Sequence, residues 1–337
     1  MRRYSLTLLA LILALAMGAA ACDSGAKLST SQPPEQMLTA AWNAHHDATS
    51  QAGTYEVALT IEADAAQLPQ DQQGMMQALL ASPIMVSGDF AIKDKPLSAD
   101  ISLNASLMGT TMAAGAKVLK DKVWMNVLGQ WYEAPAETGQ QLAAVDTNDM
   151  VDDLLKTMDE LEVDPAAWCT DLTVVGEETV ADTQVIHVRG TPDMEKMVTD
   201  VVALMQSEQM VALLGAAVPA GGSTDSAPNI PTPAEIQEMM ADYDQILEDA
   251  TLDFWLSKAD ATIRKMTVNA QIAVPRDLGI TGLSGFTVAA TINLQAINGA
   301  VNVLAPTSAL PFTNLMQNIM QNPLLQGIIQ SISGSGL

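Results

Sequence analysis

The chain has 337 residues, of which 48% are apolar and only 16% charged, with 39 acidic residues against 15 basic ones. The net charge of −24 repels nucleic-acid phosphates, and the apolar fraction is too high for a disordered acidic chain. Two cysteines exclude a disulfide-dense scaffold and a cysteine-rich zinc site. A single long apolar run, at the N-terminus, excludes a multi-span membrane protein. The length predicts one large domain or two ordinary ones.

The first 21 residues have the pattern of an export signal. Arg2 and Arg3 precede an apolar run over residues 6–17, which is too short to span a membrane well. Three alanines then lead directly to Cys22, and small residues before such a cysteine resemble a bacterial lipobox. The resemblance implies cleavage before Cys22 and acylation of its thiol and amine. The alternative is an ordinary secretory signal cut at the same small residues.

Removal of the signal takes away two arginines and no acid, so the net charge of the mature chain becomes −26. An anionic lipid surface repels such a body, and the acyl chains would therefore have to hold it. The polar stretch that follows Cys22, with a proline pair, predicts a tether over residues 22–34. One domain is expected over residues 35–306, followed by an uncharged apolar segment, 307–337. That segment is either an element docked on the core or a lid over an apolar cavity.

Period-two patterns dominate the first half of the domain. A helix is expected over residues 36–49, and from residue 54 apolar residues recur at every second position, as in half-buried strands. A Gln- and Met-rich insertion, 70–80, interrupts the pattern. Strands separated by such short turns must be antiparallel neighbours. The strands expected here are 54–62, 86–93, 99–108, 111–119, 123–127 and 131–133.

The second half mixes helices with strands. Amphipathic patterns predict helices over residues 148–161, 192–214 and 232–247, with a Gly- and Pro-rich loop over 215–233. A hairpin is expected from 170–177 and 183–190. Alternating patterns then predict strands over 251–256, 262–274 and 285–297, and residues 301–304 are expected to close the sheet.

Few residues point to chemistry. His45 and His46 diverge by about 100° on a helix and do not share a face, so no metal site is expected. Cys169 is a candidate nucleophile as a lone thiol beside Trp168, but a buried structural thiol is favoured. No G-x-S-x-G motif and no phosphate-binding glycine loop occurs. We therefore expect no cofactor and no catalytic residues; a cleft with converging ionisable groups would revive an enzyme hypothesis.

Methionine is unusually frequent, with 20 residues in the chain. Its flexible, polarisable side chain adapts to ligands of variable shape, although it also serves as a filler of cores. Both interpretations stay open. The residues predicted to form the wall of an apolar cavity are Trp124, Met125, Trp131, Met197, Val201, Met205, Phe254, Met266, Val268 and Ile292.

Two hairpin motifs suggest a family. The first, W-x-x-x-x-G-x-W-Y, covers residues 124–132, and the second, V-x-G-x-E-x-V-x₅-I-H-V, covers residues 174–188. Together with the lipobox and the order of helices and strands, they resemble the LolA/LolB and LppX/LprG-type bacterial lipoprotein carriers, over residues 36–306. The resemblance implies a half-open antiparallel sheet that wraps helices, with acyl chains between them and no catalytic residues. The insertion, the 215–233 loop and the uncharged tail depart from the family pattern.

The sequence thus predicts an α+β protein with a curved antiparallel half-barrel sheet and helices over its concave face. The predicted function is binding of lipid or acylated molecules, with transfer across the cell envelope as its extension. The protein would be extracytoplasmic and held to a bacterial membrane through Cys22, with a possible partner protein in envelope transport. The alternative function is a surface lipoprotein that binds a protein partner as a sensor or assembly factor.

Overall fold

The computed structural model describes residues 27–46, 48–64, 67, 73–74, 77, 79–93, 97–107, 109–136, 156–158, 160–161, 163–207, 247–274 and 282–315. Cys22, the 215–233 loop, most of the helices expected over 148–161 and 232–247, and most of the uncharged tail lie outside these residues. The helices are α2 (Pro34–His46), the 3₁₀ helix η2 (Pro165–Trp168) and α6 (Met194–Gln206). The strands are β1 (Ser50–Ala63), β2 (Ile84–Lys93), β3 (Ser98–Leu107), β4 (Thr110–Leu119), β5 (Lys122–Val127), β6 (Gln130–Glu133), β7 (Cys169–Val180), β8 (Thr183–Pro192), β9 (Leu247–Ser257), β10 (Ile263–Ala273), β11 (Leu283–Ile297) and β12 (Leu310–Pro311).

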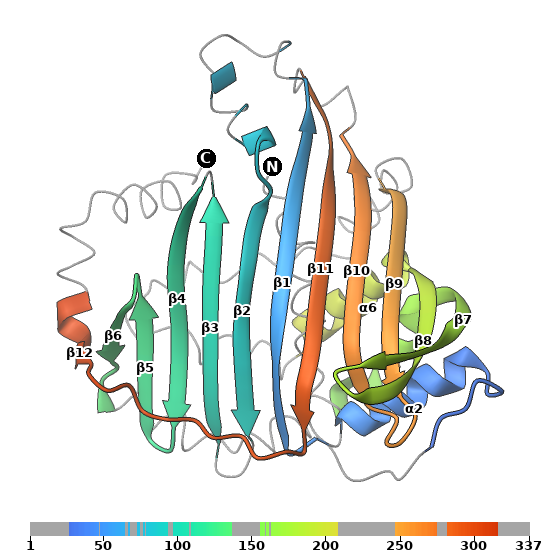
Figure 1. The fold of residues 1–337 in the computed structure, drawn as a ribbon, viewed down its shortest axis with the longest axis horizontal. Coiled ribbons are helices and arrows are strands. Elements are labelled where there is room, and N and C mark those ends of the chain that lie inside the picture. Colours follow the sequence, from blue (N-terminus) through green and yellow to red (C-terminus); the bar gives the residue numbers. More distant parts are fainter. Residues whose placement is uncertain are drawn as a thin grey trace.

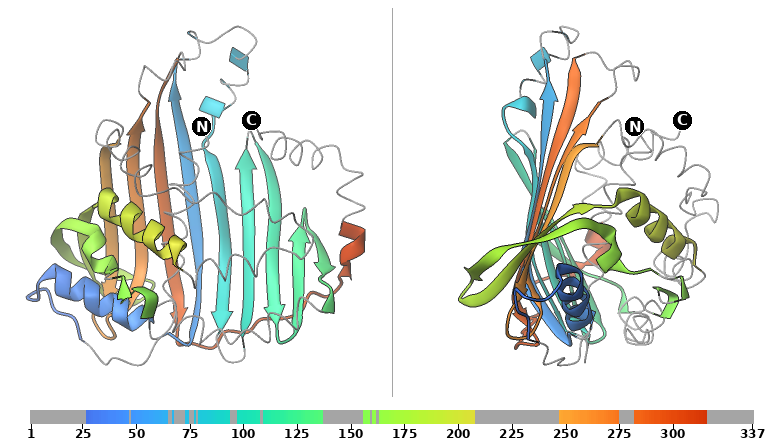
Figure 2. Two further views of the ribbon diagram at one scale, coloured as in Figure 1. Left: turned by 180° about the vertical axis from the view of Figure 1, so that it is seen from behind. Right: turned by 90° about the vertical axis from the view of Figure 1, so that its right-hand side faces the viewer.

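All twelve strands form one sheet, in the order β12-β6-β5-β4-β3-β2-β1-β11-β10-β9-β8-β7 (Figure 1). Neighbours are antiparallel, except for the parallel pair of β12 and β6. The sheet is open, with β12 and β7 at its two edges, and α2, η2 and α6 lie on one side of it (Figure 2). The predicted α+β architecture, a curved antiparallel sheet with helices over one face, is confirmed.

The two strand blocks of the sequence join at the centre of the sheet. β1 is antiparallel to β11 from the Gln51–Ile297 pair to the Ala63–Leu283 pair. These are the two longest strands, with 14 and 15 residues. Their ladder therefore turns two meanders that lie far apart in the sequence into a single continuous surface.

Residues 298–309 form a strap rather than the strand expected at 301–304. The strap leaves β11 and runs along the ends of the strands to β6, where β12 begins (Figure 1). The Asn298 amide donates to the Ser50 carbonyl at 2.9 Å, and Lys117 Nζ donates to the Leu304 carbonyl at 3.3 Å. Val303 is buried. The strap thus hydrogen-bonds to strand ends and to a side chain, not along the edge of the sheet.

The sequence misplaced the start of α6. Pro192 is the last residue of β8, and Asp193 caps the helix by accepting from the Lys196 amide at 2.9 Å. A carboxylate at this position satisfies a helix-terminal N–H group and suits the positive end of the helix dipole. Within the described residues the helix ends at Gln206, so its predicted extension to residue 214 lies mostly outside them.

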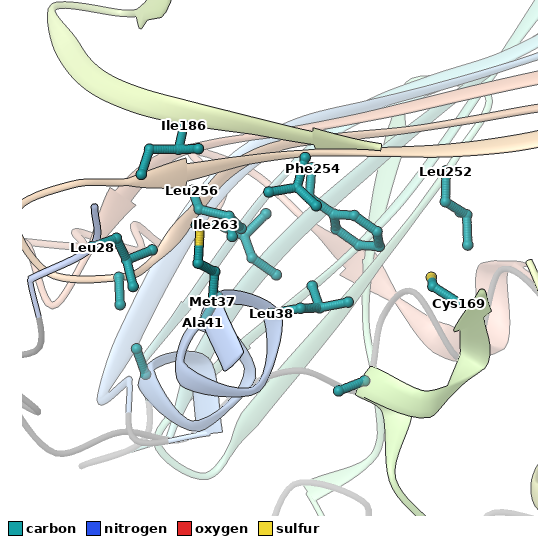
Figure 3. Packing of buried hydrophobic residues seen from close by; sticks show 14 of the residues in the cluster. Leu28, Met37, Leu38, Ala41, Cys169, Ile186, Leu252, Phe254, Leu256 and Ile263 are labelled. Atoms are coloured by element: carbon teal, nitrogen blue, oxygen red, sulfur yellow. The ribbon is translucent and has the colours of Figure 1, made fainter. Parts of the chain in front are cut away.

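The main core lies between α2 and the strands near the β7 edge. Met37, Leu38 and Ala41 point from α2 toward Phe254, Leu256 and Ile263 on the sheet (Figure 3). Met37, Ala41 and Leu256 are completely buried. Burial of a side chain the size of methionine or leucine stabilises the fold by about 1.5–3 kcal/mol, so α2 is held firmly.

His45 fixes the end of α2 to β10. Its side chain is buried, and Nε2 accepts a hydrogen bond from the Ile263 amide at 2.7 Å. Burial lowers the pKa of His45 from 6.5 to about 4, and the nearby Arg264 guanidinium lowers it further, against the raising effect of the Ile263 carbonyl oxygen, which lies 3.2 Å from Nε2 and favours the protonated ring. The neutral ring is therefore the form that the fold accepts.

We expect acid to loosen this attachment. Because the pKa of His45 is lower in the folded chain, the unfolded chain takes up a proton first, and stability falls as the pH decreases from 6.5 to about 4. The full loss corresponds to about 3 kcal/mol. Urea unfolding of the mature chain between pH 7.5 and 4.5 measures it. His45→Gln, whose amide oxygen can accept from Ile263, should remove most of this pH dependence; an unchanged pH profile would contradict the assignment.

Candidate functional site

The register of the sheet divides its side chains between two faces. Val57 of β1 pairs with Val86 on one side and Ala290 on the other, and Ala290 pairs with Val268 of β10. Val57, Val268 and Ala290 belong to the core under α2. Because paired residues point to the same face, these residues define the helix side of the whole sheet. We call this side the apolar face and the other side the polar face.

On β2 to β5 the described side chains of the apolar face are apolar, except for Thr110 at the start of β4, which pairs with Leu107. Successive pairs, such as Phe90 with Ile101 and Ile101 with Ala116, continue it from strand to strand as far as Met125. We call this part the open apolar face, because α2, η2 and α6 lie over the other half of the sheet (Figure 2). Its residues, none of them fully buried apart from the side-chain-less Gly88, are Ile84, Val86, Gly88, Phe90, Ile92, Ala99, Ile101, Leu103, Ala105, Met112, Ala114, Ala116, Val118, Val123, Met125 and Val127.

Two glycines on β1 and β2 lie beneath aromatic side chains of this face. A Cβ atom at Gly88 would lie 1.9 Å from the Ser102 carbonyl oxygen and 2.8 Å from Tyr55 Oη, which itself donates to that carbonyl at 2.8 Å. A Cβ atom at Gly53 would lie 3.0 Å from Phe90 Cζ. The two aromatic rings thus lie across glycines of the neighbouring strand instead of standing up from the sheet. A smooth apolar surface results.

The polar face differs sharply in chemistry. On β2 to β4 it presents side chains such as Asp89, Asn104 and Lys117, and Lys117 Nζ donates to Asp100 Oδ2 at 2.6 Å. An open depression of about 360 Å³ lies on it, lined by polar residues that include Glu56, Asp89 and Asn293. Such a lining suits water and polar groups rather than hydrocarbon.

The candidate wall residues on β9 to β11 lie on the predicted face. Phe254, Met266 and Val268 face α2 within the main core, and Ile292 pairs with Met266. Phe254 and Val268 are buried against the chain's own side chains. The structure therefore uses these positions to fill a core, whereas the apolar side chains on the other side of β1 stay partly exposed.

The candidates on α6 belong to a separate cluster. Met197 and Val201 are buried with Trp168 of η2, and Met205 packs against the same group. Trp168 Nε1 donates to the buried Asp200 at 2.7 Å and ties η2 to α6. The structure does not bring these three residues together with Phe254 and Val268.

The two candidate tryptophans lie on the polar face. Trp124 pairs with Lys117 and Glu133, and Trp131 pairs with Asn126, whereas Met125 pairs with Ala116 on the apolar face. Lys117 Nζ lies 5.3 Å from the centre of the Trp131 ring. Trp124 and Trp131 therefore cannot share a wall with Met125, because alternate residues of a strand point to opposite faces.

Sequence reasoning missed most of the open apolar face. Phe90, Ile101, Leu103 and Ala116 were assigned to strands but not to the candidate site. The signal was present in the parity of their positions, since apolar residues recur at every second position of these strands. The predicted cavity wall instead rests on residue type, chiefly tryptophan, methionine and phenylalanine, rather than on the position of each residue along its strand.

A polar cluster joins β7, β8, β9 and β10 on the polar face. His187 lies between two carboxylates, with Nδ1 at 2.9 Å from Glu178 and Nε2 at 2.6 Å from Asp253, and its ring stacks on Trp255. Arg189 Nε donates to Asp253 at 2.7 Å. The pKa of Glu178 is lowered chiefly by the hydrogen bond that it accepts from the Trp255 indole. Burial would raise the pKa of Asp253, but hydrogen bonds from Arg189 and His187 outweigh it and lower the pKa.

We expect Asp253→Ala to destabilise the fold by about 3 kcal/mol, because it leaves His187 and Arg189 without their shared, buried acceptor. Glu178→Ala is the matched comparison in the same cluster. Its carboxylate is 46% exposed, so the loss should stay near 1 kcal/mol. Urea unfolding at pH 7.5 measures both. Equal losses would mean that Asp253 does not organise the cluster.

Cys169 is a structural thiol. Its side chain is buried in the main core, and burial raises its pKa to about 12. A thiol with so high a pKa is not ionised near neutral pH and is a poor nucleophile.

Among the described residues no three His, Cys, Asp or Glu side chains are grouped to hold a metal ion. No helix formed by these residues is long and apolar enough to cross a membrane.

The chain resembles solved structures in its fold. No family model matches the chain, and no curated protein is significantly similar to it. Lipoprotein LppX of Mycobacterium tuberculosis is 10% identical, with a TM-score of 0.36 over 80% of this chain and 98% of that one. LprF of Mycobacterium bovis is 13% identical, with a TM-score of 0.31 over 84% and 100%. A putative outer membrane lipoprotein-sorting protein domain of Vibrio parahaemolyticus is 7% identical, with a TM-score of 0.18 over 81% and 92%.

The solved structures that this chain resembles are thus of the kind that the sequence pattern named, LppX among them. At such TM-scores the likeness carries no argument about function.

Proposed function

We propose that this protein is a bacterial lipoprotein, anchored through acylated Cys22, that binds the acyl chains of lipids or acylated molecules on the open apolar face. The observation that carries the proposal is the continuous, half-exposed apolar surface across β2 to β5, on which Thr110, at the margin, is the one hydrogen-bonding side chain among the described residues. Such a surface offers little to a polar ligand. It gains free energy by removing hydrocarbon from water.

The dimensions of the face suit an acyl chain. β3 and β4 each contain ten residues, which corresponds to a length of about 33 Å. The hydrocarbon core of a bilayer, which two acyl chains fill end to end, is about 30 Å thick. One extended chain therefore fits along the strands with room to spare. Each buried CH₂ group contributes about 0.8 kcal/mol, so one chain suffices for measurable binding.

The mode of binding requires no covalent chemistry. The flat rings of Tyr55 and Phe90 and the small side chains of Ala105, Ala114 and Ala116 leave room for a ligand close to the backbone. The wall is apolar but not shaped around one headgroup, so we expect selection by acyl chains rather than by headgroup. Transfer across the envelope is the natural use of such binding in an anchored protein.

A matched pair of variants on β4 tests the proposal. Ala114 faces the open apolar face opposite Leu103, whereas its neighbour Ala113 faces the polar side opposite Asn104. We expect Ala114→Glu to lower the lipid-loaded fraction at least tenfold, because a carboxylate beside hydrocarbon loses its hydration. Ala113→Glu should leave loading unchanged. The readout is native mass spectrometry of mature protein with Cys22→Ser, purified from bacterial envelopes.

The controls separate a folding defect from a binding defect. Both variants add the same charge to adjacent positions of one strand, and their urea midpoints should agree. Equal loading of the two variants would contradict the site. A ligand-free mass that persists after incubation with total membrane lipid would contradict lipid binding, and would favour a protein partner that covers the same face.

A further inference from the structure

We propose that the protein stands on the membrane with one end of its sheet, so that the strands rise from the lipid surface. We call this the basal end: the β4–β5 turn at Lys120, the β9–β10 turn at residues 258–262, and the strap. The partner is the lipid bilayer that carries the acyl anchor. The inference rests on the acylation of Cys22 in the proposed function and adds the docking surface.

The place where the chain enters the fold is the first argument. The Leu28 amide donates to the Lys258 carbonyl at 3.1 Å, and the Leu28 side chain is buried in the main core. The tether predicted over residues 22–34 therefore cannot move freely beyond Leu28. From Cys22 to Lys27 the chain spans at most about 17 Å when fully extended. An acyl anchor at Cys22 must hold the β9–β10 turn within that distance of the lipid.

The distribution of charge is the second argument. At the opposite end of the same strands the described residues include Glu62, Asp64 and Asp249 and no lysine or arginine. That end is repelled by anionic headgroups, in a mature chain with a net charge of −26. The described cations that gather toward the basal end are Lys27, Lys93, Lys117, Lys120, Lys122, Lys258, Arg264 and Lys265.

Acids accompany some of these cations and leave others available. Lys122 pairs with Glu133 at 2.8 Å, and Lys258 pairs with Glu177 at 2.7 Å. Lys120 is exposed at the tip of the β4–β5 turn and forms no ion pair with any described residue. Each lysine that meets an anionic surface strengthens binding about fivefold. Asp100 and Asp260 pair with Lys117 and Arg264, and the exposed Asp121 lies between Lys120 and Lys122 in the β4–β5 turn, so the basal end is near neutral overall.

The strap supplies an apolar contact. Leu304 is 64% exposed, the most exposed large apolar side chain among the described residues. It does not hang on a loose loop, because Val303 beside it is buried and its own carbonyl accepts from Lys117 Nζ at 3.3 Å. An apolar side chain held outward beside lysines matches the boundary between headgroups and acyl chains. The strap runs along the lower ends of the strands in Figure 1.

This orientation links the bilayer to the open apolar face. Ile92, Val118 and Val123 place that face at the basal end of β2, β4 and β5. An acyl chain that leaves the bilayer at this point meets apolar side chains directly. The opposite end of the strands, with Glu62, Asp64 and Asp249, and the polar face stay in water.

Depth-dependent quenching tests the orientation. The acylated mature protein is inserted into vesicles of phosphatidylethanolamine and phosphatidylglycerol that contain a headgroup spin-labelled lipid. One variant carries a fluorophore at Leu304→Cys, and its matched control carries it at Thr60→Cys, an exposed position at the other end of β1. Cys169 is buried, with a pKa of about 12, and should not react with the label. We expect quenching at position 304 at least threefold stronger than at position 60.

A charge reversal completes the test. Lys120→Glu should weaken the quenching at position 304, whereas Thr60→Glu, which adds a carboxylate at the exposed opposite end of β1, should not. Equal quenching at positions 304 and 60, or stronger quenching at 60, would overturn the orientation. Intact mass verifies acylation first, and lipid loading is measured on the same preparations. Normal loading with a failed orientation overturns this inference alone, whereas an unacylated chain overturns both the anchor and the orientation.

Discussion

The structure depends on the burial of one face of a very wide sheet. Every long strand alternates between apolar and polar residues, so register carries the apolar surface across β1 to β5 and β9 to β11 without interruption. Helices α2 and η2 cover the apolar face over β7 to β11, where Met37 and Leu256 are completely buried. Over β2 to β5 the same surface remains half-exposed. Because apolar area in water is unfavourable, the open half is where a hydrocarbon ligand gains most.

Strands were the most predictable elements, because their signal is local. Period-two alternation located β1 to β11 to within a few residues, and short turns fixed the antiparallel order within each meander. The pairing of β1 with β11 was not predictable, since these strands lie more than 200 residues apart and only their tertiary register joins them. The strap was misjudged for the opposite reason. Val301, Val303 and Leu304 imitate a strand, but the hydrogen bonds of this segment go to Ser50 and Lys117.

The candidate site was harder to predict than the fold, because two halves of one sheet share the same pattern. Nothing in the alternation of β10 distinguishes it from that of β3, yet Val268 lies in a packed core and Leu103 on the open face. The difference comes from α2, whose position is set by Leu28, Met37 and His45, far from either strand in sequence. Trp124 and Trp131 were chosen for residue type, although the parity of their neighbour Met125 already assigned them to the other face.

In the orientation that we propose, the anchor and the two faces give the molecule a common direction. A mature chain with a net charge of −26 would be repelled by an anionic membrane, so the proposed acyl chains would have to outweigh that repulsion. The repulsion is smallest when the acidic end, with Glu62 and Asp249, points away from the lipid. The packing of Leu28 against the β9–β10 turn already favours that orientation, because it leaves only a short segment between the anchor and the fold. In this proposal charge and tether act together: the charge orients the sheet, and the tether keeps the basal end of the open apolar face beside the acyl chains that it would take up.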